Sequence, residues 1–145
     1  MPTASRSVTV DRPIDKVADF LSAFASTAEW DPHTVSCRRL DDGPLGVGAR
    51  YENVQRLAGH ESTLIYQVTE YQPGRRIVLE GGNDTVHTRD EMTFAESGDG
   101  GTTVTYTIDL QLLGAAKLGE LLVPAIMKKV ADDGEDGMRE SLLKL

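Results

Sequence analysis

The stretch that decides the fold runs from residue 5 to residue 24 and reads SRSVTVDRPIDKVADFLSAF. In its first part polar and apolar residues alternate, with Val8 and Val10 on one side, which is the period-2 pattern of a half-buried strand. In its second part a potential N-cap at Asp11 and a proline at position 13 precede apolar residues at helical spacing. The stretch therefore predicts an opening strand that leads directly into a helix over about residues 13–24.

A second short helix is expected next, followed by a long β-rich region. Ser26 offers an N-cap for a helix at 26–30, and Pro32 disfavours helical geometry in the residue before it. From position 35 to position 112, short β-rich runs alternate with glycine, proline and aspartate. We place strands at 35–40, 49–57, 62–71, 76–81, 86–95 and 102–112. Because the connections are short, these strands are expected to form antiparallel hairpins.

The last part of the chain returns to helical spacing. After Gly114 apolar residues recur at intervals of four, at Leu118, Leu122, Ile126 and Val130. We predict a long C-terminal helix that presents this line to the sheet. Pro124 is a potential kink, and glycines at 134 and 137 weaken the helix by up to roughly 1 kcal/mol each relative to alanine.

Length, charge and composition limit the classes of function. A chain of 145 residues is close to the commonest domain size, so we predict one domain over residues 1–145. The net charge of −8 disfavours nucleic acid and anionic membrane surfaces as partners. The single cysteine, Cys37, permits no intramolecular disulfide, and no stretch of about 18 apolar residues suggests a membrane span. We therefore expect a cytoplasmic protein without integral membrane association.

A curved antiparallel sheet with one apolar face can bury that face by wrapping around a helix. The segments at residues 8–24, 29–32 (EWDP), 43–51 (GPLGVGARY), 66–79 (YQVTEYQPGRRIVL) and 100–106 (GGTTVTY) resemble, in this order, the SRPBCC superfamily. That superfamily includes START domains, polyketide cyclases and dehydrases, and the birch pollen allergen. The resemblance implies an α+β helix-grip fold, in which a curved antiparallel sheet of about seven strands wraps around a long C-terminal helix, with two short helices after the first strand.

Strand alternation and the helical line predict an internal cavity and the residues around it. We expect the cavity between the sheet and the C-terminal helix, with the helix glycines leaving room for it and Trp30 plugging one end. The predicted ligand-binding residues are Trp30, Tyr51, Asn53, Leu64, Tyr66, Val68, Leu79, Asp90, Met92, Tyr106, Ile108, Ile126 and Val130. The alternative for each apolar residue is a place in an ordinary core. For Tyr51 and Asn53 the reversed strand face is also open.

Asp90 is the most informative of these residues. Met92 is predicted to point inward, and Asp90, two residues earlier on the same predicted strand, therefore points inward as well. A carboxylate in that position must be hydrogen-bonded, paired or solvated. It is a candidate ligand anchor or general base. The alternative is a bulge or a one-residue slip that turns the carboxylate outward, or an ion pair with Arg89 or Arg50.

The remaining candidate motifs point to no metal or cofactor. His33, His60 and His87 lie far apart in the chain and form no known ligand spacing, so we predict no metal site and no cofactor. His33 and His87 remain weaker catalytic candidates beside Asp90. The glycine-rich segment 43–48 precedes a strand and lacks the G-K-[ST] ending of a phosphate loop. We interpret it as a turn over the cavity entrance.

Three functions remain compatible with the sequence. The first is a domain that binds or carries an apolar or amphipathic small molecule, lipid-like or polyketide-like, and has no chemistry of its own. The second is a polyketide cyclase, aromatase or dehydratase that moves protons with a cavity residue such as Asp90 or His87. In the third the pocket is collapsed and the domain acts through partners. The identity of the ligand and the oligomeric state are left open.

Overall fold

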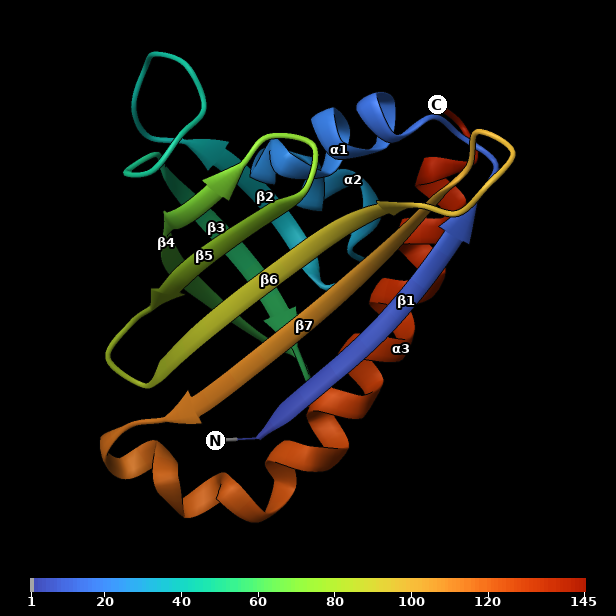
Figure 1. The fold of residues 1–145 in the computed structure, drawn as a ribbon. Coiled ribbons are helices and arrows are strands. Elements are labelled where there is room, and N and C mark those ends of the chain that lie inside the picture. The colour runs from blue at the N-terminus through green and yellow to red at the C-terminus, as the bar shows by residue number, and fades with distance from the viewer. Residues whose placement is uncertain (1) are drawn as a thin grey trace.

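The elements of the computed structural model, which describes residues 2–145, follow the predicted order (Figure 1). The strands are β1 (Thr3–Val10), β2 (Thr34–Arg39), β3 (Arg50–Leu57), β4 (His60–Gln72), β5 (Arg76–Gly82), β6 (Val86–Glu96) and β7 (Thr102–Leu112). The helices are α1 (Ile14–Ser22), the short 3-10 helix η1 (Phe24–Ser26), α2 (Thr27–Trp30), the 3-10 helix η2 (Gly114–Leu122) and α3 (Val123–Leu142). The first predicted helix ends earlier than expected, because Ala23 adopts an extended conformation.

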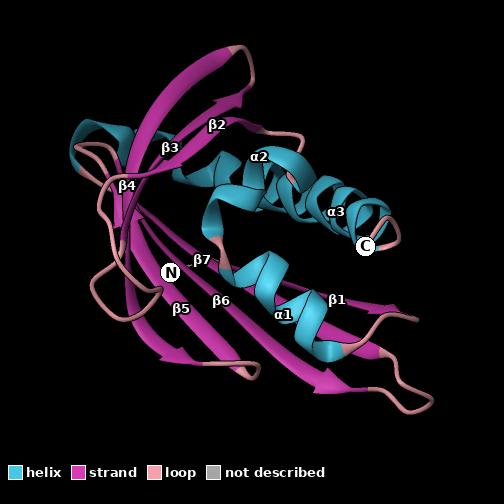
Figure 2. Cartoon of the chain, turned by 90° about the horizontal axis from the view of Figure 1, so that it is seen from above, coloured by secondary structure: helices cyan, strands magenta, loops and turns pink. Residues whose placement is uncertain are grey.

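The strands form one antiparallel sheet in the order β1-β7-β6-β5-β4-β3-β2. Each consecutive pair from β2 to β7 is a hairpin, and β1 closes the order by pairing with β7. Seen from above, the sheet bends around the helices, which lie on its concave side (Figure 2). This arrangement is the α+β helix-grip fold that the sequence predicted.

The bend of the sheet has two local causes. The β3–β4 hairpin turns through Ala58 and Gly59, which both have positive φ and match the right-handed twist of the flanking strands. The pairing of β4 with β5 shifts register between Val68 and Glu70, and such an irregularity bends and twists a strand. The sheet therefore curves enough to surround α3.

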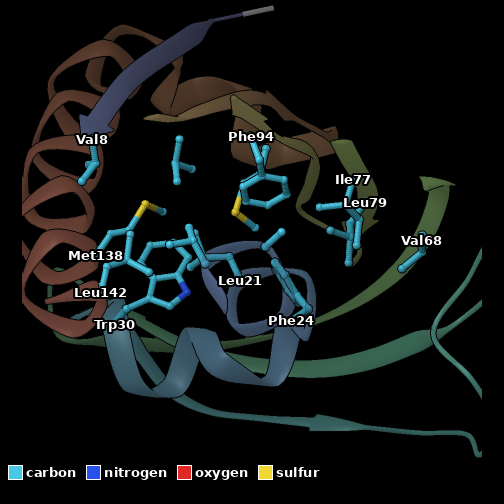
Figure 3. Packing of buried hydrophobic residues seen from close by; sticks show 14 of the residues in the cluster. Val8, Leu21, Phe24, Trp30, Val68, Ile77, Leu79, Phe94, Met138 and Leu142 are labelled. Atoms are coloured by element: carbon cyan, nitrogen blue, oxygen red, sulfur yellow. The ribbon is translucent and has the colours of Figure 1, made fainter. Parts of the chain in front are cut away.

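The core is densest at the end of the sheet where α1, α2 and the last turns of α3 meet (Figure 3). Leu21 of α1 and Trp30 of α2 pack there with Met138 and Leu142 of α3, and each side chain is at most 2% exposed. Val8 of β1 joins the same cluster. Burial of these side chains fixes the C-terminal half of α3 against the sheet.

The face that α3 buries differs from the predicted one. The buried residues are Val123, Met127, Ala131, Gly134, Met138 and Leu142. Leu118 is 93% exposed, so for this residue the prediction that the line faces the sheet is wrong. Leu122, Ile126 and Val130 border a cavity between α3 and the sheet and do not belong to the buried face. The reason is that η2 has about three residues per turn, which breaks the helical phase before α3 begins. Pro124 lies in the first turn of α3, where its missing N–H costs nothing, and is not a mid-helix kink.

The glycines of α3 also act differently from the expectation. A Cβ on Gly137 would collide with the carbonyl oxygen of Trp30, and a Cβ on Gly134 would lie 3.6 Å from the Trp30 ring. Gly137 therefore allows a close approach of two backbones. The glycines bring the helix and α2 together, and the cavity lies elsewhere.

Candidate ligand-binding cavity

The expected cavity lies between the sheet and the first half of α3, away from the packed end. Its inner lobe has a volume of about 60 Å³ and is lined mainly by Asp31, His33, Tyr66, Asp90 and Tyr106, together with Ile108 and Val130. Its outer lobe has a volume of about 290 Å³ and is lined mainly by Leu64, Val86, Leu112, Leu122 and Val123. Both lobes border Gln55, Leu57, Thr88, Leu110, Ile126 and Met127, so they are adjacent parts of one cavity.

The cavity opens at the end of the sheet opposite to the predicted entrance. Gln55 and Leu57, which line it, lie at the end of β3, whereas the loop at residues 43–48 precedes the start of that strand. No residue of this loop lines either lobe, so its prediction as a cover of the entrance is wrong. A larger depression of about 440 Å³ lies beside Pro13 and the β6–β7 turn, but its lining residues are mostly exposed and form a surface groove.

A polar floor closes the inner lobe. The hydroxyl of Tyr106 donates a hydrogen bond of 2.7 Å to Oδ2 of Asp90. Oδ1 of Asp90 and Oγ1 of Thr88 are buried and have no hydrogen-bond partner of good geometry among the described residues. A buried polar atom without a partner costs free energy. The Thr88 side chain also interacts with the Tyr66 hydroxyl, so Oδ1 of Asp90 is the clearest case of unused hydrogen-bonding capacity in this floor.

The prediction that Asp90 points inward is confirmed. The alternatives, a bulge or register slip that turns it outward or an ion pair with Arg89 or Arg50, are not. Asp90 pairs with Ile108 in an unbroken β6–β7 register, so no slip turns it outward. It is 4% exposed. Arg89 lies on the other face of β6, where it approaches Glu70 at 3.6 Å and Asp109 at 3.9 Å.

Burial changes the acid–base properties of the floor. Desolvation raises the pKa of Asp90 from 3.8 to about 7, although the hydrogen bond from Tyr106 opposes this rise and the charges of Asp31 and Asp109 add to it. Desolvation and the neighbouring Asp90 carboxylate raise the pKa values of Tyr106 and Tyr66 well above the ordinary value. Asp90 can therefore exchange a proton near neutral pH, while both phenols remain donors.

Tyr66 is placed over the floor by a glycine on the neighbouring strand. Gly81 pairs with Tyr66, and a Cβ at this position would lie 2.7 Å from the Tyr66 ring. The absent side chain gives the ring its space. The Tyr66 hydroxyl lies 3.5 Å from Nε2 of Gln55, so Gln55 reaches the same part of the inner lobe.

Asp31 and His33 form a rim of the inner lobe, and neither belongs to the predicted ligand-binding set. Asp31 accepts hydrogen bonds from the His33 backbone N–H (3.0 Å) and the Thr34 hydroxyl (2.8 Å). Desolvation raises the pKa of Asp31, and these hydrogen bonds partly offset the rise. His33 Nε2 lies 2.9 Å from Oδ2 of Asp133 on α3. The only sequence signal was the position of both residues directly after Trp30.

The predicted ligand-binding residues divide into two groups. Seven of the thirteen line the cavity: Leu64, Tyr66, Asp90, Tyr106, Ile108, Ile126 and Val130. Six lie behind it in the packed core: Trp30, Tyr51, Asn53, Val68, Leu79 and Met92. The lining residues Gln55, Leu57, Thr88, Leu110 and Met127 were missing from the predicted set, although strand alternation had already placed Thr88 inward.

Contacts settle the positions of three residues of the predicted binding set, Trp30, Tyr51 and Asn53, and of the catalytic candidate His87. Tyr51 and Asn53 face inward, so the reversed face is wrong, and Asn53 Nδ2 donates to the Thr27 hydroxyl at 3.2 Å. Trp30 contacts Tyr106 edge to face, with ring centroids 5.5 Å apart. His87 lies outside the cavity on the convex face, 3.4 Å from Glu80. Its position removes it from the cavity, whereas Asp90, Asp31 and His33 line the inner lobe.

Comparison with known proteins agrees with this geometry. The family described as "Polyketide cyclase / dehydrase and lipid transport" matches residues 1–143. The chain belongs to this family. No curated protein sequence matches it. The polyketide cyclase/dehydrase and lipid transport family lies within the START/polyketide cyclase (SRPBCC) superfamily, which confirms the resemblance noted in the sequence.

Solved structures with the same fold include other members of that superfamily. The Zhui aromatase/cyclase from Streptomyces sp. R1128 has a TM-score of 0.80 and 17% identity, over 97% of this chain and 92% of that chain. A START superfamily protein from Mycobacterium smegmatis has a TM-score of 0.82 and 13% identity, over 98% and 97%. The di-domain ARO/CYC of the BE-7585A biosynthetic pathway has a TM-score of 0.75 and 15% identity, over 98% of this chain and 46% of that chain. These identities show the shared fold.

Residues 2–145 contain neither a candidate membrane-spanning helix nor a candidate metal-binding cluster. No helix in this range combines the length and apolar character needed to cross a membrane. No group of three or more His, Cys, Asp and Glu side chains in the same range is placed to hold a metal ion.

Proposed function

We propose that this family member binds an apolar or amphipathic small molecule in the two-lobed cavity. The observation that carries the proposal is the combination of an apolar outer lobe with a floor that holds two unpartnered buried polar atoms, Asp90 Oδ1 and Thr88 Oγ1. Small-molecule sites typically combine apolar walls with a few polar groups that orient the ligand. The floor would fix the polar end of the ligand, and the outer lobe would hold its apolar part.

The apolar walls supply the affinity in this proposal. Leucines and valines from β4, β6, β7 and α3 face the outer lobe, and removal of their surface from water contributes about 25 cal/mol per Å². The aromatase/cyclase and START titles of similar structures fit a cavity of this kind.

A cyclase or dehydratase is the second candidate, supported by Asp90. A buried carboxyl with a pKa of about 7, hydrogen-bonded to a phenol, suits a group that accepts and returns a proton at neutral pH. Its only hydrogen-bond partner among the described residues is Tyr106, so a reaction would need the substrate to supply the remaining polar groups. Binding is therefore the function that the geometry supports best.

The test is a fluorescence titration with N-phenyl-1-naphthylamine, an uncharged apolar probe, together with native mass spectrometry of the purified protein. We expect saturable binding of the probe to the wild type. Tyr106→Phe should weaken binding by roughly 0.5–1.5 kcal/mol, because it removes a neutral hydrogen bond and frees the Asp90 carboxyl that it orients. Tyr106→Ala should instead cost about 3–5 kcal/mol of stability, because it removes a large ring from the cavity wall.

A matched control is Tyr71→Phe on β4, because Tyr71 packs at the edge of the core and lines neither lobe. Its probe affinity should equal that of the wild type. Absence of saturable probe binding to the wild type, with no co-purified small molecule, would contradict the proposed function. Unchanged affinity in Tyr106→Phe with a lower thermal midpoint would leave Tyr106 as a packing residue only.

A further inference from the structure

The two residues that carry the unpartnered atoms of the floor lie close enough to contact one ligand group. Thr88 and Asp90 are two residues apart on β6 and share its inner face, so their Cα atoms are about 7 Å apart. Each residue is 4% exposed. Both residues line the inner lobe, so one ligand group at its floor is within reach of both side chains.

The hydrogen-bond roles of these atoms define the group that complements them. Oδ2 of Asp90 already accepts from the Tyr106 hydroxyl, which leaves Oδ1 as the carboxyl oxygen without a partner. The hydroxyl of Thr88 can donate or accept. A group that donates to Asp90 and accepts from Thr88 satisfies both atoms, and a hydroxyl does this with one oxygen.

The charges around the cavity exclude an anionic head group. The ionisable side chains that line the two lobes, apart from the tyrosines, are Asp31, His33 and Asp90, and neither lobe has a lysine or arginine in its lining. His33 Nε2 already contacts Asp133. A carboxylate or phosphate in the inner lobe would therefore lose its hydration and meet two carboxyl groups without a compensating cation.

The nearest lysines of α3 do not change this conclusion. Lys128 donates to Asp132 at 2.7 Å, and Lys129 donates to Asp133 at 2.9 Å. Both lysine side chains are more than 70% exposed, at 75% and 71%. They point to solvent and are already paired.

We propose that the cavity selects an uncharged amphiphile that carries a hydroxyl group, an alcohol or a phenol, and that this hydroxyl binds between Asp90 and Thr88. This inference rests on the proposed function and names the class of its ligand. An ammonium head group fits less well, because it has three donors and no acceptor, so it cannot accept from Thr88 and would lose hydration in a largely apolar cavity.

The experiment is displacement of N-phenyl-1-naphthylamine by four octyl compounds that differ only at the head: octan-1-ol, methyl octyl ether, octanoate and octylammonium. At about pH 8 Asp90 is mostly ionised and acts as an acceptor. We expect octan-1-ol to displace the probe at a concentration about tenfold lower than that needed for methyl octyl ether or octanoate. Methyl octyl ether cannot donate a hydrogen bond, and octanoate is charged.

Two variants locate the head group. Asp90→Asn removes the negative charge with little change in shape, so the preference for octan-1-ol over octanoate should fall by about fivefold or more. Asp136→Asn makes the same change of net charge at an exposed position of α3 and should leave the preference unchanged. Thr88→Val removes only the hydroxyl and should weaken octan-1-ol by about threefold or more without a comparable effect on methyl octyl ether.

The possible results separate this inference from the proposed function. Equal displacement by octan-1-ol, methyl octyl ether and octanoate would overturn the inference and leave probe binding intact. Stronger binding of octylammonium than of octan-1-ol would overturn it as well, and so would an unchanged preference in Asp90→Asn. Absence of probe binding to the wild type would overturn both the inference and the proposed function.

Discussion

The two ends of the space between α3 and the sheet differ in the distance at which helix and sheet meet. At the C-terminal end, Gly137 brings α3 against the backbone of Trp30, and large apolar side chains fill the space. At the N-terminal end η2 replaces the regular helix, and the two lobes of the cavity remain between Leu122, Ile126 and the strands. One helix therefore closes the core at one end and leaves a binding site at the other.

The two ends also differ in how their polar groups are satisfied. The packed end buries mainly apolar side chains, although the indole N–H of Trp30 has no partner among the described residues. The open end buries Asp90 and Thr88, whose unpartnered oxygens reduce stability. The comparison teaches that unpartnered buried polar atoms occur at both ends, and that those of Asp90 and Thr88 belong to residues that line the cavity.

The largest expected effect is the pH dependence of stability that comes from Asp90. The pKa of Asp90 is about 7 in the folded protein, compared with an ordinary value of 3.8. Below the lower value the carboxyl is protonated in both states, so its favourable contribution is fully present. As the pH rises the unfolded chain releases the proton first, and the contribution is lost by the time the pH passes the folded value. The total change is about 4 kcal/mol.

Asp90→Asn should remove this dependence. The free energy of unfolding of the variant, minus that of the wild type, should increase by about 4 kcal/mol between about pH 4 and about pH 8. Urea titrations of both proteins across this range measure the difference. Subtraction cancels the opposite contributions of Asp41, Asp132 and Asp133, whose pKa values are lowered by their cationic partners. A difference that does not change with pH would contradict burial of the Asp90 charge.

The next effect tests the packed end with two glycines of the same helix. Gly137→Ala should lower the free energy of unfolding by about 3 kcal/mol, because the new Cβ collides with the Trp30 carbonyl and forces α3 away. Gly134→Ala is the control, since its Cβ would be in ordinary contact with the Trp30 ring at 3.6 Å. Its higher helix propensity should raise stability by up to about 1 kcal/mol. Equal effects of the two substitutions, measured by urea unfolding, would disprove the close approach.

The smallest effect is expected at the exposed leucines of η2. Leu118 and Leu121 are 93% and 94% exposed, so Leu118→Ser and Leu121→Ser should change the free energy of unfolding by no more than about 0.5 kcal/mol. Thermal and urea unfolding provide the measurement. A loss of 2 kcal/mol or more, by the usual magnitudes for a buried leucine, would mean that these side chains are packed in solution.

Most of the fold and about a third of the cavity-lining residues follow from local pattern. Alternation along β4, β6 and β7 placed Leu64, Tyr66, Asp90, Tyr106 and Ile108 on the inner face, because a strand has a fixed period of two. The same rule could not tell how far along a strand the cavity extends. Met92 and Tyr106 are paired across β6 and β7, yet only Tyr106 lines the cavity.

The sequence by itself determined the order of elements, the antiparallel sheet and the inward phase of Asp90, since each depends on periods and turns that operate over a few residues. The tertiary structure alone decided which end of the sheet is open. That choice depends on the contact of Gly137 with Trp30, on the 3-10 geometry of η2, and on the rim formed by Asp31 and His33. The contact of Gly137 with Trp30 and the bond of His33 to Asp133 join residues about a hundred positions apart, and a local pattern carries no information about the distance at which they meet.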